Sequence, residues 1–436
     1  MTCRRLFAFA LLPLLAAPAC AMAALSAQER AMAADVDAGH ERSIELLRAL
    51  VEQNSGTMNF AGVEAVARML RPEFEALGFE VEWKPMAQAN RAGHLIATHA
   101  GKPGGKRLLL IGHLDTVFEP DSPFTGFVRD GDVAKGPGVG DDKGGVVVML
   151  AALRAMHAAG TLDDADIEVV LTGDEEDAGS PIGVSRADLI AAGKRADVAL
   201  DFEGLSREGG RDMGSIARRS SNSWQLTTSG RSGHSSGIFS EGVGDGAINE
   251  MARIIAAFRS ELPEPDLTFN VGLLGGGQSA ELDAASVRIA ATGKGNIIPS
   301  VAVAIGDFRT LSPEQTERVK AKMQGIVSRH LPHTGAEIVF DEAYPPVAPS
   351  AGNRALLAAL NEVNRDLGLE PMAELDPLKR GAGDIGFVAA DVDSLIGLGI
   401  AGNGSHAPGE TADLSSLPRQ AKRAAILMSR LARSPR

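Results

Sequence analysis

Acidic and histidine residues stand directly after short apolar runs at four places in this chain of 436 residues. Each run has the length and the apolar character of a strand that is buried on both faces of a parallel sheet. The carboxyl ends of such strands meet at one edge of the sheet, where ligands bind in open α/β folds. We therefore expect a set of side chains to converge there: His113 and Asp115 after 107–112, Glu175 and Glu176 after 167–171, Asp201 and Glu203 after 198–200, and His406 after 394–400.

The chemistry that this set suits is hydrolysis at a metal centre. Imidazole and carboxylate groups are ligands for Zn²⁺, Mn²⁺ and Co²⁺, and the set contains no thiol. Asp141 and Asp142 add two more carboxylates in the glycine-rich segment 138–145, which opens a helix. So many carboxylates exceed the needs of one zinc ion and suit two metal ions joined by a bridging carboxylate. A spare carboxylate would then deprotonate the attacking water.

Each of these motifs alone also has an ordinary structural explanation. The Asp141-Asp142 pair suits a solvated helix start with an N-cap, and Glu175-Glu176 suits surface charge. Asp201 or Glu203 suits a buried salt bridge. The joint placement at the ends of successive buried strands favours the metal site, because charges there are costly unless they are paired or coordinated.

The elements that must position these residues alternate between strand and helix. Besides the four apolar runs, helical periodicity marks the segments 41–52, 63–77, 144–159, 187–192, 354–367 and 415–431. This alternation predicts an α/β fold, with a mostly parallel sheet flanked by helices, over residues 25–217 and 345–436.

Residues 218–344 have a different pattern. We expect strands at 224–228, 267–274, 285–291 and 301–308, and helices at 242–259 and 312–330, after which 337–344 leads back to the first domain. This predicts a second domain, an α+β unit of βαββ type that is inserted into the first.

The composition and the N-terminus limit where and with what the protein acts. The net charge of −13 argues against nucleic-acid binding, and two cysteines exclude a disulfide framework or a cysteine-rich zinc site. Cys3 and Cys20 both fall in residues 1–24, where Arg4 and Arg5 precede an apolar run and small-residue cleavage sites. This is typical of a signal peptide, so we expect an exported, periplasmic or secreted protein without a membrane segment after cleavage. A lipoprotein anchor at Cys20 is the alternative.

Taken together, the motifs resemble the dinuclear-zinc hydrolase family that includes carboxypeptidase G, peptidase T, acetylornithine deacetylase and succinyl-diaminopimelate desuccinylase. The resemblance runs in order over nearly the whole chain after the signal peptide, and the glutamate carboxypeptidase subgroup is the most similar. The motifs that carry it are 112–118, 136–145, 172–176, 233–235, 296–299 with 307–309, and His406.

The resemblance implies roles for the residues at the strand ends. His113, Asp141 and Glu203 would bind one Zn²⁺, and Asp141, Glu176 and His406 the other, with Co²⁺ or Mn²⁺ as substitutes. Asp115 would orient His113. Glu175 would be the general base that activates a metal-bridging water, and the peptide bond after Asp141 would be cis.

One ligand position departs from the family pattern. The family usually has Glu-Pro or Asp-Gly here, whereas this chain has Asp201-Phe202-Glu203-Gly204. The Phe-Glu pair matches the carboxypeptidase pattern, so Glu203 is the expected ligand and Asp201 is the alternative.

The resemblance also gives the inserted domain a part in the reaction, as a lid or a dimerisation domain. His234 would donate a hydrogen bond to the developing oxyanion, and it reaches into the neighbouring subunit in several dimeric members. Arg309, with Asn296 nearby, would bind the substrate carboxylate. The alternative for Arg309 is a salt bridge to Asp307.

These expectations combine into one function. The chain would be an exopeptidase or amidohydrolase that cleaves the amide bond to a C-terminal, glutamate-like amino acid of a small peptide or N-acyl amino acid. The alternatives within the enzymes are an aminopeptidase of tripeptidase type and an N-acyl amino acid deacylase. The alternative outside the enzymes is a periplasmic binding protein that keeps the fold without the chemistry.

Overall fold

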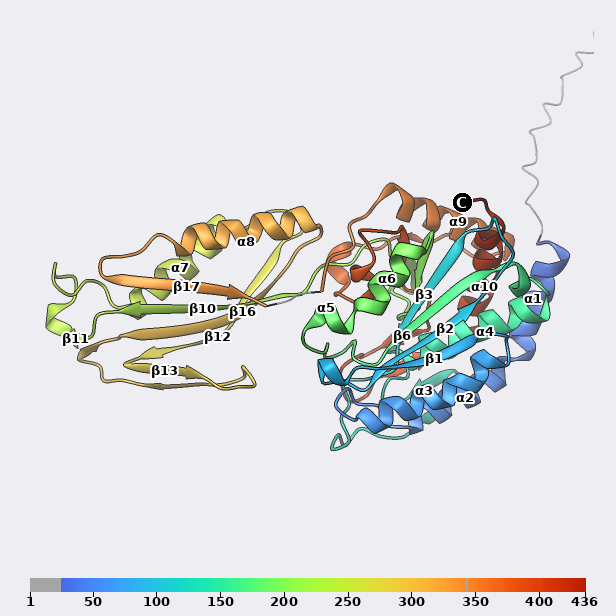
Figure 1. The fold of residues 1–436 in the computed structure, drawn as a ribbon, viewed down its shortest axis with the longest axis horizontal. Helices are drawn as coiled ribbons and strands as arrows, with labels where there is room; N and C mark the ends of the chain where they lie inside the picture. Colours follow the sequence, from blue (N-terminus) through green and yellow to red (C-terminus); the bar gives the residue numbers. More distant parts are fainter. Residues whose placement is uncertain (1–24, 342–343) are drawn as a thin grey trace, which may run out of the picture.

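The computed structural model of the protein describes residues 25–341 and 344–436. The predicted signal peptide, 1–24, lies outside the described residues. Figure 1 shows two bodies side by side: a larger body built on a mixed sheet with helices on both faces, and a smaller, elongated body with two helices on one sheet.

The larger body is built on a six-stranded sheet in the order β1-β2-β6-β3-β7-β19. The strands β6, β3, β7 and β19 run parallel to one another, and β1 and β2 add an antiparallel edge. The predicted α/β class with a mostly parallel sheet is therefore confirmed. The strands are β1 Glu80–Pro85, β2 Gly93–His99, β3 Arg107–His113, β6 Asp166–Thr172, β7 Val198–Asp201 and β19 Ser394–Leu395.

Strands β1 and β2 were not predicted from the sequence. The strand that we expected at 394–400 is the shorter β19. Strand β1 is exposed along much of its length and carries alternating charges, so it lacks the apolar run of a central strand. Strand β19 ends at Leu395, because the chain then turns toward Ser215 and Glu203 rather than continuing the sheet.

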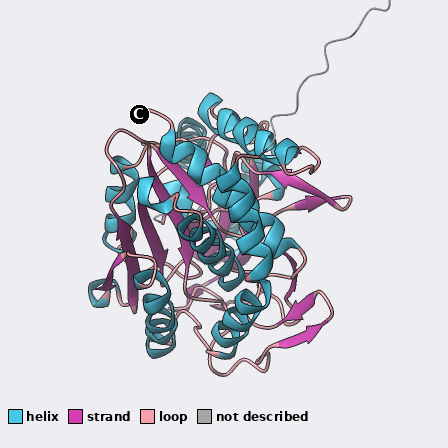
Figure 2. Ribbon diagram, turned by 90° about the vertical axis from the view of Figure 1, so that its right-hand side faces the viewer, coloured by secondary structure: helices cyan, strands magenta, loops and turns pink. Residues whose placement is uncertain are grey.

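Helices cover both faces of this sheet (Figure 2). One face packs against the core that contains α1–α4 and α10, and the other packs against α6 and the short helix η5. Helix α9 packs against β19 and α10. Their bounds are α1 Ala27–Ala38, α2 His40–Glu52, α3 Phe60–Glu75, α4 Lys143–Ala158, α5 Ile182–Ser185, α6 Ala187–Arg195, α9 Ala351–Asp366, α10 Ser416–Arg433 and η5 Asp384–Phe387.

Helix α4 is the central helix of the larger body and begins at the candidate site. Nearly all of its residues are buried, as expected for a helix that is apolar on every side. Gly145 lies so close to the carbonyl of Phe202 that a Cβ atom there would be 1.9 Å from the oxygen. The glycine therefore lets the first turn of α4 pack directly against the end of β7.

The smaller body is an antiparallel sheet in the order β12-β16-β10-β17 with α7 and α8 packed against it. Its main elements follow the order βαββαβ, which contains both helices that we expected and adds β17, a strand that we did not predict. The elements are β10 Asn222–Gly230, α7 Ala247–Glu261, β12 Thr268–Gly277, β16 Val301–Arg309, α8 Pro313–Val327 and β17 Thr334–Phe340.

Two boundaries in this body differ from the prediction. Helix α7 begins at Ala247 rather than at residue 242, because Gly244 and Gly246 adopt positive φ angles of 79° and 76°. The strand that we expected at 285–291 is the shorter β14 Ile289–Thr292, which pairs with β13 Ser279–Leu282. The turn between these two strands contains Ser286 at a φ of 55°.

Small sheets connect the loops around the carboxyl edge. The sheet β20-β21-β5-β4 joins the loop that contains His406 to the segment before Asp141. The remaining strands are β4 Val128–Asp130, β5 Val133–Lys135, β8 Arg207–Glu208, β9 Arg211–Gly214, β11 Gly233–His234, β15 Ile297–Ile298, β18 Ala373–Glu374, β20 Ala401–Asn403 and β21 Thr411–Asp413.

The chain enters and leaves the smaller body through two adjacent segments. Arg218 and Val347 exchange backbone hydrogen bonds, and so do Ser221 and Tyr344. The two crossings therefore form a short antiparallel ribbon. None of the helices in the described residues is long and apolar enough to cross a membrane.

Candidate metal centre

Asp141 lies between two histidines that are far apart in the sequence. Its Oδ1 is 3.0 Å from Nε2 of His113, which ends β3. Its Oδ2 is 3.3 Å from Nε2 of His406, which lies in the loop after β20. Each oxygen of one carboxylate thus faces a different imidazole, which is the arrangement of a carboxylate that bridges two ligand sets.

Glu176 completes the cluster from the end of β6. Its Oε2 is 2.9 Å from Nε2 of His406. The ligand atoms of His113, Asp141 and Glu176 lie within 4.8 Å of one another, so these residues could hold a metal ion. The peptide bond between Asp141 and Asp142 is cis, as the resemblance implied.

The electrostatics of the cluster favour a bound cation. Hydrogen bonds to Asp141 and Glu176 raise the pKa of His406 to about 10. Burial lowers the pKa of His113, but Asp115 and Asp141 outweigh it and raise this pKa well above its usual range. The carboxylates that stabilise a proton on each imidazole would equally stabilise a divalent cation.

The fully buried carboxylate of Asp115 fixes the loop that carries the two glutamates. It accepts hydrogen bonds from the backbone amides of Glu175 at 3.1 Å and Glu176 at 3.2 Å, and from the hydroxyl of Thr57 at 2.6 Å. Its Oδ1 is also 3.3 Å from Nδ1 of His113. Asp115 therefore orients the histidine and the 175–176 segment together.

Glu175 carries a carboxylate that accepts no hydrogen bond from any of the described residues. Burial and the negative charge of Glu203 raise its pKa well above the usual range. A carboxylate with a raised pKa, beside possible metal ligands, is suited to take up and release a proton near neutral pH.

Glu203 and Asp201 both face Arg218, which the sequence analysis did not single out. Arg218 donates from Nη1 to Oε1 of Glu203, and the same nitrogen is 3.4 Å from Oδ2 of Asp201. Nη2 of Arg380 is 3.7 Å from the other oxygen of Glu203. Asp201 is the more deeply buried of the two carboxylates, and its Oδ1 accepts the backbone amide of Glu203 at 3.2 Å.

Arg218 packs against the backbone of residues 381–383, which leaves no space for a side chain at Gly383. Its Nε donates to the carbonyl of Gly381 at 2.7 Å, and its Nη2 donates to that of Ala382. A Cβ atom on Gly383 would lie 2.2 Å from Nη1 of the same guanidinium. The absence of a side chain at Gly383 therefore allows the pair between Arg218 and Glu203 to form.

Glu410 holds the backbone that leads to Asp141. Its buried carboxylate accepts hydrogen bonds from the amides of Gly138, Gly140 and Asp141 at 2.9, 2.8 and 2.9 Å. Burial raises its pKa to about 7, against the effect of these donors. The sequence analysis missed this residue, because Gly138 and Glu410 are 272 positions apart and no local pattern connects them.

A fully buried arginine lies beneath the glutamate loop and was also missed. Arg186 donates to Asp174 at 2.6 Å and to Asp384 at 2.7 Å, and Thr172 donates to the other oxygen of Asp384. The network joins the end of β6 to the start of η5. It therefore connects the segment before Glu175 to the glycine-rich segment 381–383.

The three residues expected from the smaller body do not meet at the cluster within this chain. His234 lies in β11, at the end of the smaller body that is farthest from the larger one (Figure 1). Asn296 is exposed and precedes β15, which pairs with β11. Arg309 ends β16 at the opposite end of the smaller body, and this strand of nine residues alone spans about 26 Å.

Arg309 lies beside the larger body. A Cβ atom on Gly381 would be 3.8 Å from its Nη1. Its Nε is 3.5 Å from Oδ2 of Asp307, which is the salt bridge that we gave as the alternative. Both groups are partly exposed, so this ion pair leaves the guanidinium open to solvent.

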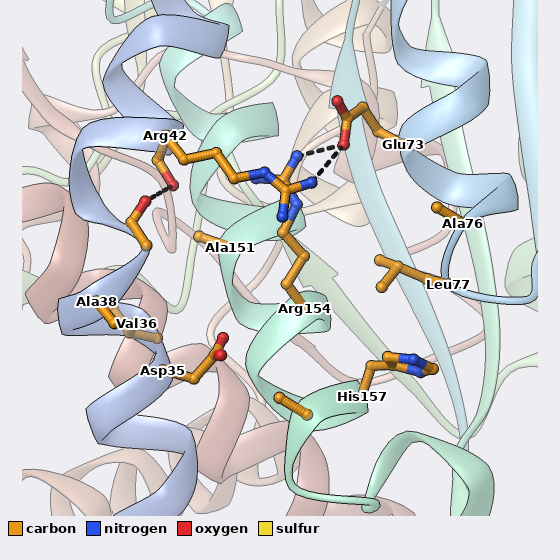
Figure 3. A pocket seen from close by; sticks show the side chains of 13 residues that line it. Asp35, Val36, Ala38, Arg42, Glu73, Ala76, Leu77, Ala151, Arg154 and His157 are labelled. Carbon is orange, nitrogen blue, oxygen red and sulfur yellow. Dashed lines mark hydrogen bonds and ion pairs between the residues drawn. The ribbon is translucent and has the colours of Figure 1, made fainter.

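Two cavities are relevant to the location of the site. One of about 270 Å³ is lined by Gly140, Gly204 and Ser405, which are next to Asp141, Glu203 and His406 in the sequence, but none of these three lines it. Another, of about 500 Å³, lies among α1–α4, where Arg42 and Arg154 both contact Glu73 (Figure 3). Helices α1, α3 and α4 end around it, and both arginines are paired with Glu73 near the end of α3.

The fold and the cluster together define a hydrolase with a metal-binding site at the carboxyl edge of its sheet. The model of Peptidase family M20/M25/M40 matches residues 109–430. The chain therefore belongs to this family and is a hydrolase that acts on peptide or amide bonds.

Individual relatives agree with this assignment. The chain is 27% identical to carboxypeptidase G2 of Pseudomonas sp. (strain RS-16) over 397 residues, which cover 88% of each chain. It is 27% identical to succinyl-diaminopimelate desuccinylase of Gluconobacter oxydans (strain 621H) over 314 residues, which cover 69% of this chain and 76% of the other. A tripeptidase from Staphylococcus aureus has the same fold, with a TM-score of 0.69 at 20% identity, over 91% of this chain and 99% of its own.

Proposed function

We propose that this protein is an exported, dinuclear-zinc carboxypeptidase or amidohydrolase that cleaves the amide bond to a C-terminal, glutamate-like amino acid. The observation that carries the proposal is the position of Asp141, with one carboxylate oxygen toward His113 and the other toward His406. The similarity to carboxypeptidase G2 over most of both chains supports the direction of cleavage.

The donor set fits two zinc ions. His113, Asp141 and Glu203 would hold one ion, and Asp141, Glu176 and His406 the other, so that each ion has imidazole and carboxylate ligands. Co²⁺ and Mn²⁺ accept the same donors. When bound, the pair would polarise the amide carbonyl and lower the pKa of a water molecule.

The residues of the chain would move the proton and hold the substrate. Glu175 would take a proton from the attacking water and deliver it to the leaving amine. Its half-buried carboxylate supports this role, because it has a raised pKa and accepts no hydrogen bond from the described residues. Asp115 would keep His113 in one orientation. Arg309, beside Gly381, would bind the terminal carboxylate, with His234 and Asn296 completing the site from a second subunit.

Deacylation of an N-acyl amino acid is the second candidate. The similarity to succinyl-diaminopimelate desuccinylase favours it, and the same residues would perform it, because both reactions hydrolyse an amide. The two candidates differ in the group on the acyl side.

Export and assembly complete the proposal. Residues 1–24 would direct the chain to the periplasm or the exterior and then be removed. Residues 218–344 would act as a lid and a dimerisation domain between the two parts of the catalytic domain, 25–217 and 345–436. The ribbon of Arg218 with Val347 and Ser221 with Tyr344 would supply the hinge for such a movement.

The test is a hydrolysis screen on the zinc-loaded protein. The substrates are dipeptides with C-terminal glutamate, the same dipeptides with an amidated C-terminus, N-succinyl and N-acetyl amino acids, and tripeptides with a free or blocked N-terminus. We expect turnover that requires a free C-terminal carboxylate and stops on removal of metal by a chelator. Equal turnover of the amidated dipeptides would refute the carboxypeptidase assignment, and chelator-resistant turnover would refute the metal mechanism.

A further inference from the structure

Tyr344 is the single tyrosine of the chain, and its hydroxyl lies between the candidate base and the buried arginine. The hydroxyl oxygen is 2.7 Å from the backbone carbonyl oxygen of Glu175 and 2.9 Å from Nη2 of Arg186. The ring packs edge-on against Phe387 at 5.1 Å. The phenol is thus held on one side by charge and on the other by aromatic packing.

The direction of these hydrogen bonds follows from the groups involved. A guanidinium has only donors, so Arg186 donates to the phenol oxygen. A carbonyl has only acceptors, so Tyr344 donates its hydroxyl hydrogen to Glu175. A hydroxyl that accepts from a cation is a stronger donor, because the two bonds polarise each other.

The peptide groups of Glu175 are therefore held from both sides. Its amide donates to Asp115, which also faces His113. Its carbonyl accepts from Tyr344. The side chain of Glu175 accepts no hydrogen bond from the described residues, so these two backbone bonds fix the main chain from which its carboxylate extends.

The two contacts come from different parts of the molecule. Asp115 follows β3 in the larger body, whereas Tyr344 lies in the ribbon that leads to the smaller body. Tyr344 exchanges both backbone hydrogen bonds with Ser221, at 3.0 and 3.1 Å. A displacement of this ribbon would move the phenol, and with it the carbonyl of Glu175.

We propose that Tyr344 is a positioning residue, which holds the candidate base Glu175 in place from the hinge of the inserted domain through its hydroxyl. The role of Glu175 in this statement rests on the proposed function. The contact itself does not, since it joins the hinge ribbon to the metal-binding loop whatever the substrate is.

The first test is Tyr344→Phe, which removes the hydroxyl and keeps the ring against Phe387. A displacement of about 1 Å costs a reaction on the order of 100-fold, so we expect kcat to fall by about 10- to 100-fold. KM and the metal content should stay within about twofold of wild type. Ser328→Ala, which removes an exposed hydroxyl at the end of α8 that donates to the carbonyl of Gly325, is the control and should retain kcat.

Two outcomes would overturn the proposal. One is an unchanged kcat in Tyr344→Phe. The other is a decrease in kcat/KM that comes entirely from lost metal or from a higher KM. The hydroxyl would then stabilise the fold or the metal ligands rather than position the base.

A second measurement does not depend on turnover. Labelling with 3-fluorotyrosine gives one ¹⁹F resonance, because the chain has one tyrosine. We expect this resonance to shift when Zn²⁺ is added, since the metal would order the 175–176 loop that Tyr344 contacts. If the chemical shift of this resonance stays the same when the protein is saturated with Zn²⁺, the proposed link between Tyr344 and the 175–176 loop is wrong. A shifted resonance in a protein that hydrolyses no amide would refute the proposed function alone.

Discussion

The carboxylate of Glu410 accepts the backbone amide of Asp141 at 2.9 Å, although the two residues are 269 positions apart. The same carboxylate accepts two further amides of this loop, at Gly138 and Gly140. One side chain therefore sets the backbone path on which the bridging position of Asp141 depends. Removal of this carboxylate would leave three backbone amides of the loop without their hydrogen-bond acceptor.

We expect Glu410→Gln to weaken metal binding by about 10- to 100-fold, because changes to groups that hold a metal ligand typically have this effect. The amide of glutamine keeps one acceptor oxygen and turns an NH₂ group toward at least one backbone donor. A competition titration with a chromophoric chelator measures the affinity. Glu374→Gln, on the surface beside Arg354, is the matched control. An unchanged affinity in Glu410→Gln would show that the loop keeps its path without the carboxylate.

Glu175→Gln should reduce kcat by at least about 100-fold, while the protein still binds its full complement of metal. Glutamine cannot carry a proton from water to the leaving amine, and it has the same shape. Steady-state kinetics and elemental analysis on the same sample check both parts. Glu64→Gln, on the exposed surface of α3, should behave as wild type. Substantial turnover in Glu175→Gln would assign the proton transfer to another group.

Replacing Asp201 and replacing Glu203, the two carboxylates at the end of β7, should change the number of bound metal ions differently. We expect Glu203→Gln to lower the bound metal from two equivalents to one, and Asp201→Asn to retain both. Asp201 is almost completely buried and accepts the amide of Glu203, which suits a supporting role. Metal content after dialysis against a weak chelator measures the difference. The reverse result would make Asp201 the ligand, which is the alternative that the sequence left open.

Arg186→Met should destabilise the larger body by about 3–5 kcal/mol, because it leaves the carboxylates of Asp174 and Asp384 buried without their cation. Trp83 in β1 is the only tryptophan in a Trp224→Phe background, so its fluorescence follows urea unfolding of this body.

The matched control for this variant is Arg68→Met on α3, whose exposed pair with Glu64 should contribute less than about 1 kcal/mol. If Arg186→Met loses no more stability than this control, then water or a neighbouring donor must form hydrogen bonds with the carboxylates of Asp174 and Asp384 in place of the guanidinium.

Complementation tests whether His234 acts in a second subunit. His234→Asn and Glu175→Gln should each be nearly inactive. In a mixed dimer, one site would combine His234 from one chain with Glu175 from the other, so an equal mixture should recover about a quarter of the wild-type activity. The mixture is prepared by co-expression with two affinity tags. Absence of recovery in purified mixed dimers would contradict a shared site.

The sequence predicted the elements whose signal is local. The apolar runs before His113, Glu175 and Glu203 belong to central strands, where a buried position demands apolar residues on both faces. Strands β1 and β2 were not predicted, because strands at an antiparallel edge of a sheet do not require a continuous apolar run. The rule that ligands gather at the carboxyl ends of strands then named most of the residues around Asp141.

The residues that hold the cluster in place were not predictable in the same way. Arg186, Arg218, Tyr344 and Glu410 each contact partners that are far away in the chain, and each looks like an ordinary charged or aromatic residue in its own segment. The separation of His234 from Arg309 also follows from the length of β16 rather than from any motif. Such contacts are properties of the tertiary structure.

The ribbon of Arg218 with Val347 and Ser221 with Tyr344 has a consequence for how this architecture can change. Both crossings of the chain occur at one place, so the two ends of the segment 222–340 lie side by side. A segment of different size with the same spacing of its ends could replace it without altering the register of any strand in the six-stranded sheet. Chimaeras joined at these four residues would therefore test whether the smaller body can be exchanged independently of the residues near Asp141.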